Sequence, residues 1–469
     1  MVTQTWIKWL QTPVMISFSQ SPTNIWEIPF PAVTVCPQSK VNTRRYNVTA
    51  AFRRMWNDNV TSDENLHRIR KFSDASLLCG NRFNVKSNQI ADSASIDFFT
   101  KIAPSLRDVF GYCYWESDVN CNDIFSPTLT NEGVCFTFNM MDKTQLYTKQ
   151  AYIKDNYGKH KNVSNWTIDD GFFKNNTTPN TSFPRRAITS GDSDKLSLTL
   201  QIFLKSISGM CYRSEGFKIL LHHPAEVPRF ITRHFRASVN QIFDIAVKPE
   251  MTVTSPNVKN YDPHVRKCYF SYERSLQFFQ FYTQENCHVE CLANYTLATC
   301  GCVGYYMPHV NSTTFCTNGD NEEYKCLRQA ERNLLHQQMI SEILSSQHKT
   351  DKNPLVDCDC LPSCTSIVYN AEISQSGYQN KETKFKHVTI LDIYFKEKTF
   401  TSAERNELFS PDFWANCGGL LGLFTGFSVL SIVELAYFLT LRLICNCKRY
   451  GKHFWAGVEV HTGETNNKF

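Results

Sequence analysis

"NCGGLLGLFTGFSVLSIVELAYFLTLRLICNC", residues 416–447, is the longest apolar run in the chain. Within it, residues 417–441 are long enough to cross a bilayer, because a transmembrane helix needs about 20 mostly apolar residues. The run contains one acid, Glu434, which would cost on the order of 3 kcal/mol if it faced lipid. We therefore expect a membrane-spanning segment in which Glu434 faces a cavity or another helix.

Small residues recur in and just before this run, at Ala415, Gly418, Gly422 and Gly426. They form a narrow face that lets helices approach closely, and the simplest interpretation is a dimerisation stripe. Gly426 also allows the backbone to leave helical geometry, which frees carbonyl oxygens that need water, ions or protein as partners. Copies converging on one axis would offer these oxygens, with the hydroxyls of Ser428 and Ser431, to a partly dehydrated cation. On the residues alone, a pore and a plain anchor remain equal alternatives.

The cysteines indicate an oxidising compartment. Sixteen of the 19 lie between Cys36 and Cys364, in polar and aromatic-rich sequence. Cytosolic proteins seldom carry so many, so we expect an extracellular domain with up to eight disulfides. Sequons for N-glycosylation agree, and all nine precede the apolar run, at Asn47, Asn59, Asn162, Asn165, Asn175, Asn176, Asn180, Asn294 and Asn311.

Charge gives the orientation of the apolar run. Basic residues crowd its far end, at Arg442, Lys448, Arg449 and Lys452. By the positive-inside bias, this end is cytosolic and the cysteine-rich part is outside. The net charge of +5, from 49 basic and 44 acidic residues, is too balanced to predict nucleic-acid binding.

The N-terminal stretch "MVTQTWIKWLQTPVMISFS" is harder to interpret. It has neither the charged start and apolar core of a signal peptide nor the length of a membrane span. Either the late apolar run carries a large domain across the membrane, or the sequence lacks its true beginning. We favour the second interpretation.

Several segments have the pattern of strands, namely residues 28–37, 134–140, 195–206, 216–228 and 387–395. Residues 322–348 contain neither Gly nor Pro and carry apolar side chains at helical spacing, which predicts a long amphipathic helix. Residues 44–130 mix short helical patterns with Asn, Asp and Ser, and we interpret them as a loop-rich excursion. We interpret residues 155–195 as an exposed, partly mobile polar insertion. Strands so far apart in the sequence indicate a central sheet with appendages.

Ten cysteines fall within residues 268–364. Cys287 and Cys291 are four apart and would share a helix face, whereas Cys358 and Cys360 are two apart and would share a strand face. Two adjacent disulfides could therefore clip a helix to a strand. Four such thiols could also bind zinc, and an unrelated disulfide-rich receptor would carry a similar array, so these alternatives stay open.

The apolar run resembles the second membrane segment of the epithelial sodium channel/degenerin (amiloride-sensitive sodium channel) family, which includes the acid-sensing channels. The family's Gly-x-Ser signature stands here as Gly426-Phe427-Ser428, with Glu434 six residues beyond the serine. "FPAVTVC" resembles the strand after the first membrane helix, and the ten-cysteine spacing resembles the thumb region. Stretches such as "GFKILLHHPAEVP" and "TPVMISFS" are most similar to the pickpocket branch found in insects.

The resemblance implies an α+β fold. Its ectodomain would be disulfide-rich and hand-like, with a palm sheet, finger, thumb, knuckle and β-ball, and would precede a C-terminal transmembrane helix. We expect a remnant of the first membrane helix and wrist at 1–27, the extracellular domain at 28–415 with its thumb at about 266–366, the pore helix at 416–444 and a cytosolic tail at 445–469. The family's first membrane helix and its His-Gly motif are missing from the sequence, which indicates N-terminal truncation.

The resemblance also implies disulfide pairs. In the thumb these are Cys268–Cys364, Cys287–Cys360, Cys291–Cys358, Cys300–Cys326 and Cys302–Cys316. Elsewhere they are Cys36–Cys135 and Cys113–Cys121. Cys79 and Cys211 are left, and we pair them only by elimination.

The pore residues follow by position. Gly426, Phe427 and Ser428 map to the selectivity filter, and Ala415 maps to a position that needs a small side chain for the pore to close. Further candidates along the pore and gate are Asn416, Gly418, Gly419, Gly422, Ser431 and Glu434. Asp412 would lie at the outer mouth, where it could concentrate cations or simply cap a helix.

The function implied is a subunit of a trimeric, sodium-selective channel of the plasma membrane. Its partners would be other subunits of the family, as homo- or heterotrimer, membrane lipid and an amiloride-type blocker. No enzyme motif is found, and no cofactor is expected beyond the permeant Na⁺. The alternative is a single-pass, disulfide-rich receptor or a non-conducting auxiliary subunit. The gating stimulus does not follow from the sequence.

Overall fold

The structure is a computed structural model. It describes residues 13–57, 63–79, 91–116, 120–153, 166–172, 182–202, 211, 214–231, 233–316, 322–344, 358–378, 387–407, 418–419, 422–423, 426 and 428–450. The chain divides into two compact units, one of residues 16–405 and one that joins residues 1–15 with 406–469.

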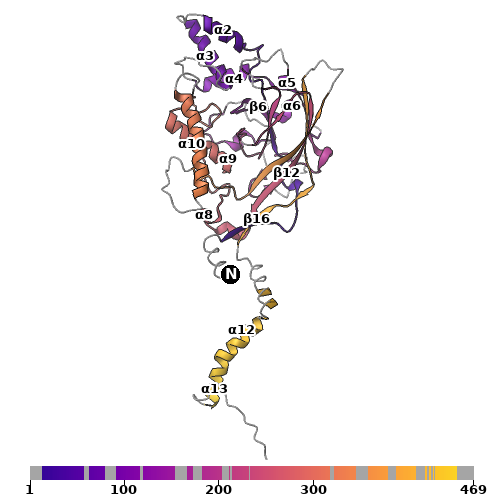
Figure 1. Ribbon diagram of the computed structural model, residues 1–469, viewed down its shortest axis with the longest axis vertical. Coiled ribbons are helices and arrows are strands. Elements are labelled where there is room, and N and C mark those ends of the chain that lie inside the picture. The colour runs from indigo at the N-terminus through magenta and orange to yellow at the C-terminus, as the bar shows by residue number, and fades with distance from the viewer. Residues whose placement is uncertain are drawn as a thin grey trace, which may run out of the picture. The chain divides into compact units, whose positions relative to one another are not determined.

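A seven-stranded sheet is the largest element of the first unit. Its strands lie in the order β1 (Val14–Phe18), β16 (Ala403–Glu407), β12 (Gln241–Thr254), β14 (Val388–Phe395), β9 (Leu196–Gln201) and β4 (Phe110–Tyr114), and β13 (Ser366–Gly377) also pairs with β12 (Figure 1). β13 runs antiparallel along one edge of β12, while β14 and β16 run parallel to it and share the other edge. β12 is 14 residues long, so β14 pairs with its first half and β16 with its last residues along the same edge.

A five-stranded antiparallel sheet packs beside it. The order is β11 (Phe235–Ala237), β10 (Phe217–His222), β3 (Ala32–Pro37), β6 (Gly133–Phe138) and β5 (Phe125–Thr130). Every residue of β3, β6 and β10 is buried, because both faces of this sheet are covered, so these strands have apolar runs rather than alternation. Phe30 joins the core of both sheets, with its ring 4.6 Å from Trp115 and 5.3 Å from Phe395.

Helices cover the sheets. In Figure 1, α2 (Val48–Asn57), α3 (Asp63–Leu78) and α4 (Ser93–Ile102) gather at one end of the unit, and α9 (Gln284–Cys300) and α10 (Glu322–Leu344) run along one side. Shorter α-helices are α5 (Leu106–Val109), α6 (Cys121–Ile124), α7 (Lys143–Leu146) and α8 (Pro263–Arg266). The remaining small elements are the paired strands β2 (Thr23–Asn24) and β15 (Thr399–Phe400), the hairpin β7 (Trp166–Thr167) and β8 (Gly171–Phe172), and 3-10 turns at Ile25–Glu27, Gly191–Asp194 and Pro256–Asn260.

The five strands expected from the sequence are present as β3, β6, β9, β10 and β14, and the helix expected at 322–348 is α10. The short helical patterns noted within residues 44–130 correspond to α2, α3 and α4, so this part of the chain contains more helix than a loop-rich excursion would. α4 shows how short these patterns are: its buried Ile96, Phe99 and Ile102 form a short stripe, and its start depends on Asp92, whose side chain accepts from the amide of Ala94.

The insertion expected at 155–195 is partly ordered in the described residues. β7 and β8 form a hairpin in which Trp166 and Ile168 are buried. Most of the rest of that polar stretch, at 154–165 and 173–181, lies outside the described residues.

Eight disulfides hold this unit together. They join Cys36 to Cys135, Cys79 to Cys211, Cys113 to Cys121, Cys268 to Cys364, Cys287 to Cys360, Cys291 to Cys358, Cys300 to Cys326 and Cys302 to Cys316. These are the pairs implied by the resemblance, plus the pair reached by elimination. Because all ten cysteines of the 268–364 array are bridged, they do not supply the thiolates that a zinc site requires.

One local expectation about this array is corrected. Cys287 and Cys291 share a face of helix α9 as predicted, but Cys358 and Cys360 do not lie on a strand. Asp359 between them has a left-handed backbone, with φ of 44°. Its side chain accepts a hydrogen bond of 2.7 Å from the hydroxyl of Tyr269, which lies in the segment before α9.

Candidate functional site

The candidate pore segment lies in the second unit and contains an interrupted helix. Helix α12 (Val429–Ala436) begins after Ser428 and continues through a π-helical turn at Tyr437–Leu441 into α13 (Arg442–Tyr450). Residues Leu430–Lys448 are long and apolar enough to cross a membrane, with a mean hydropathy of 1.5. None of this span is buried within the chain, so its apolar side chains are available to lipid or to other helices.

The interruption falls at Gly426. Its backbone is left-handed, with φ of 65°, a conformation that glycine adopts without the steric cost of a Cβ. The Gly426 amide still donates to the carbonyl of Gly422 at 3.0 Å, so one helical turn closes there before the backbone turns away. The backbone therefore leaves helical geometry at Gly426, as its sequence position allowed.

Ser428 starts the next helix by capping it. Its backbone is extended, and its hydroxyl accepts from the amide of Ser431 at 3.3 Å. The Ser431 hydroxyl in turn accepts from the Ser428 amide at 3.3 Å, which completes a reciprocal capping box. Both hydroxyls predicted to face a pore are thus engaged with the backbone of the helix start, although each retains further hydrogen-bonding capacity.

The other predicted pore residues divide into two groups. Gly418, Gly419 and Gly422 are described and helical, and Glu434 is exposed on α12, two turns below the break. At Gly418, Gly419 and Gly426, no described atom beyond the local backbone lies within 4 Å of the position that a Cβ would take, so the space beside them is open. Asp412, Ala415, Asn416 and Phe427 lie outside the described residues.

Cysteines and sequons can be placed as well. Cys445 and Cys447, in α13, are not in disulfides. Asn47, Asn294 and Asn311 are exposed, as a glycosylated residue must be. The six remaining sequon asparagines, Asn59, Asn162, Asn165, Asn175, Asn176 and Asn180, lie outside the described residues.

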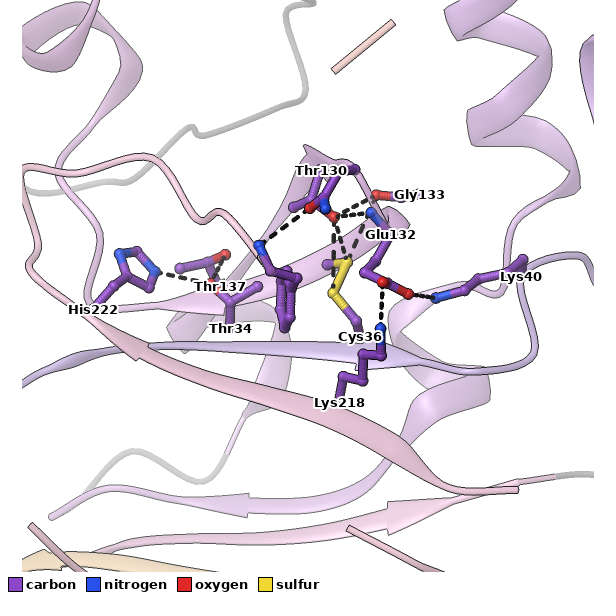
Figure 2. Close-up of a disulfide and its surroundings, with 12 residues drawn as sticks. Thr34, Cys36, Lys40, Thr130, Glu132, Gly133, Thr137, Lys218 and His222 are labelled. Atoms are coloured by element: carbon purple, nitrogen blue, oxygen red, sulfur yellow. Dashed lines mark hydrogen bonds and ion pairs between the residues drawn. A yellow bond between two sulfur atoms is a disulfide. The ribbon is translucent and has the colours of Figure 1, made fainter. Parts of the chain in front are cut away.

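The sequence did not reveal a charged cluster beside the Cys36–Cys135 disulfide (Figure 2). Glu132, in the turn between β5 and β6, forms ion pairs with Lys40 at 3.0 Å and with Lys218 of β10. The three side chains are 18%, 12% and 11% exposed, respectively. They are up to 178 residues apart in the chain, at positions 40 and 218, so no local pattern could have predicted this cluster.

Comparison with known proteins gives the family. The family model described as "Amiloride-sensitive sodium channel" matches residues 1–438. Pickpocket protein 28 of Drosophila melanogaster is 27% identical over 476 residues, which cover 95% of this chain and 72% of that protein. Sodium channel protein Nach of Drosophila melanogaster is 22% identical, over 93% of this chain and 78% of its own. Acid-sensing ion channel 2 of Homo sapiens is 22% identical, over 75% and 60%.

Proposed function

Because this chain belongs to the amiloride-sensitive sodium channel family, we propose that it is one subunit of a trimeric, sodium-selective channel that opens in response to a ligand or another stimulus. The family consists of ion channels, so the chain is a sodium channel subunit and not an enzyme. The trimer, the preference for sodium and the gating are our proposal. Other subunits of the same family would be the partners, in a homo- or heterotrimer.

The helix break at Gly426 carries the proposal. A continuous helix satisfies its own carbonyls, whereas a break in a membrane segment frees them, and they are tolerated only beside protein or water. In three copies around an axis, the carbonyls of Gly426-Phe427-Ser428 would form a ring that replaces part of the hydration shell of Na⁺. Ser431 and Glu434, one and two turns further along, would continue the polar path.

The other pore roles follow from position. Gly418, Gly419 and Gly422 would allow the helices to approach above the filter, with Ala415 and Asn416 at the gate. Asp412 would raise the local cation concentration at the outer mouth. An amiloride-type blocker would bind in this outer part of the pore.

The chain is an integral membrane protein, as its family is. We propose that residues 28–415 are extracellular and hand-like, with the thumb at about 266–366, and that 416–444 form the pore helix and 445–469 a cytosolic tail. Eight disulfides support an oxidising compartment for the first unit, and Arg442 and Lys448 support a cytosolic end for α13.

Ion substitution tests the filter. In cells that express this subunit, Ser428→Ala is expected to shift the reversal potential when external Na⁺ is exchanged for K⁺, because it removes a hydroxyl at the narrowest point. Ser431→Ala is expected to give a smaller shift, because it breaks the same capping box from the other side but lies one turn beyond the proposed filter. Equal shifts in both variants would show a helix-capping effect, and an unchanged potential in Ser428→Ala would contradict the filter assignment.

A further inference from the structure

A cavity of 370 Å³ opens between the five-stranded sheet and helix α10. Its walls come from the ends of β3 and α3, the β5–β6 turn, β10, β11 and one face of α10, all within the first unit. The volume lies within the range of about 300–1,000 Å³ that is usual for small-molecule sites. The cavity is therefore large enough for a compact organic ligand, and it is remote in sequence from the candidate pore segment.

The described lining of this cavity has a strong excess of positive charge. Its cationic side chains are Lys40, Lys218, Arg229, Arg236, Arg328 and Arg332. Its acidic side chains are Glu132 and Glu331. Charges that face one cavity act together and concentrate ions of opposite sign.

The inner wall holds the buried part of this charge. Glu132 is shared by Lys40 and Lys218, so one negative charge faces two positive ones (Figure 2). Burial lowers the pKa of Lys40 to about 8; Glu132 opposes this shift, and the charges of Lys218 and Arg236 add to it. The lysine charges are therefore incompletely compensated, and an added anion would stabilise them.

The rim holds arginines that have no acidic partner among the described residues. The Arg236 guanidinium donates to Ser214 Oγ at 3.0 Å, and that of Arg332 donates to Gln329 Oε1 at 3.0 Å. Both side chains are exposed, and each guanidinium retains free N–H groups in the planar arrangement that matches a carboxylate. They come from two different elements of the cavity lining, since Arg236 lies on strand β11 and Arg332 on helix α10.

The remaining charges are already paired. Arg229 lies 3.6 Å from Glu285, and Arg328 lies 3.5 Å from Glu331 and donates to the Tyr324 hydroxyl at 2.7 Å. Among the described residues, the unpaired positive charge of the cavity lining is thus concentrated at Arg236 and Arg332.

We propose that this cavity binds a small organic anion that carries two or more carboxylate groups. Arg236 and Arg332 would each hold a carboxylate, and Lys40 and Lys218 would attract the charge. Tyr305, Tyr306 and Tyr324 also line the cavity and would pack against the carbon skeleton. The carboxylates can come from a free polycarboxylate or from the acidic side chains of a short peptide. Binding of either would link β11 to α10, and it does not require the chain to conduct ions.

A direct binding assay tests this proposal independently of the proposed channel function. Radiolabelled citrate is titrated onto the purified full chain in detergent, at about 50 and about 300 mM salt, with triglutamate as competitor. We expect saturable binding that weakens at the higher salt, because screening reduces the attraction between charges. Displacement by triglutamate at concentrations below those of unlabelled citrate would identify a peptide as the better ligand, and the reverse order would identify a free polycarboxylate.

The variants decide whether the cavity is the site. Arg236→Gln and Arg332→Gln are each expected to weaken binding roughly tenfold, a loss of about 1.4 kcal/mol. Arg107→Gln is the matched control, because Arg107 is an exposed arginine of α5 that does not line the cavity. Neither rim arginine has an ion pair among the described residues, so the variants should keep the unfolding temperature of the unliganded protein. No saturable binding of either probe, or the same loss in Arg107→Gln as in the rim variants, would overturn the proposal.

Discussion

Glu132 is held by two lysines at once, in a place where water reaches little of any of the three side chains. Such a cluster is sensitive to the loss of its central charge. Without the Glu132 carboxylate, Lys40 and Lys218 would be two largely buried positive charges that repel each other and are poorly hydrated. The same three residues also show why sequence could not reveal this site, because Glu132 is 92 residues from Lys40 and 86 from Lys218.

Glu132→Gln is therefore expected to destabilise the first unit by about 3 kcal/mol, near the lower end of the range for broken buried ion pairs. Burial by itself would raise the pKa of Glu132, but the charges and hydrogen bonds of Lys40 and Lys218 together lower it below 4.5. A lowered pKa means that the stabilisation is complete above pH 4.5 and is lost as the pH falls through the folded-state value. The difference in unfolding temperature between wild type and variant should thus be full at pH 7 and shrink in acid.

A matched control exists on the surface. Glu372 is also flanked by two lysines, Lys248 at 2.5 Å and Lys396 at 2.6 Å, but the three side chains are 53%, 46% and 39% exposed. Glu372→Gln should change the unfolding temperature much less, because solvent screens exposed pairs. Similar losses in both variants would contradict the importance of burial at Glu132.

At the scale of elements, strands with a regular alternation of apolar and polar residues could be predicted from the sequence, whereas strands with an interrupted alternation could not. β9 was predicted because Leu196, Leu198 and Leu200 alternate with partly exposed residues. β12 and β13 were missed, although they form the longest pairing of the seven-stranded sheet. β12 alternates only over its first half, where Phe243, Ile245 and Val247 are buried, and Pro249 then interrupts the pattern; β13 likewise alternates only at its start and is exposed over its second half, so neither keeps the period of a half-buried strand along its length. The register of β12 and β13 is set by pairing with strands that are distant in the sequence, and the sequence pattern does not reveal this pairing.

The turn that leads into β10 depends on a glycine. Gly216 has φ of 107°, and a Cβ there would collide with the backbone carbonyl oxygen of Ala237 on β11. Gly216→Ala should therefore lower the unfolding temperature sharply and reduce yield, because the β10–β11 pairing must open to admit the methyl group.

Gly191→Ala separates this clash from backbone strain. Gly191 also has a positive φ, of 77°, but nothing lies within 4 Å of its Cβ position. This variant should lose only the strain cost, of order 1–3 kcal/mol. If Gly216→Ala were no worse than Gly191→Ala in the same thermal unfolding assay, close packing of Gly216 against β11 would be refuted.

At the scale of the molecule, the pairing of the disulfides could not be predicted from the spacing of the cysteines in the sequence. Seven pairs among the sixteen extracellular cysteines followed from the family resemblance and the eighth, Cys79 with Cys211, from elimination; none followed from their separations. Spacing did predict that Cys287 and Cys291 share a helix face. It failed for Cys358 and Cys360, because the left-handed Asp359 between them depends on contacts with residues near 269–274, far back in the chain.

The proposed orientation has a direct consequence for glycosylation. At least five of the nine sequons should carry glycan in cells, since all of them precede the apolar run and three described ones are exposed. Treatment with an N-glycosidase should therefore increase the electrophoretic mobility of the protein in several steps. The triple variant Asn47→Gln, Asn294→Gln and Asn311→Gln should remove only part of that shift. An unchanged mobility after the enzyme would place the first unit on the cytosolic side.

The central claim is that cations pass the helix break at Gly426-Phe427-Ser428, and cysteine accessibility tests it most directly. In a background with Cys417, Cys445 and Cys447 replaced by serine, single cysteines at Gly426, Ser428 and Glu434 are exposed to Ag⁺ during current recording. Ile432→Cys is the control for Glu434→Cys, because it lies about 200° from Glu434 around α12 and so on the opposite face of the helix from that residue. We predict that Ag⁺ rapidly reduces the current through the three pore variants and leaves the Ile432 variant unchanged. Unmodified cysteines at all three pore positions, in channels that still conduct, would contradict the account.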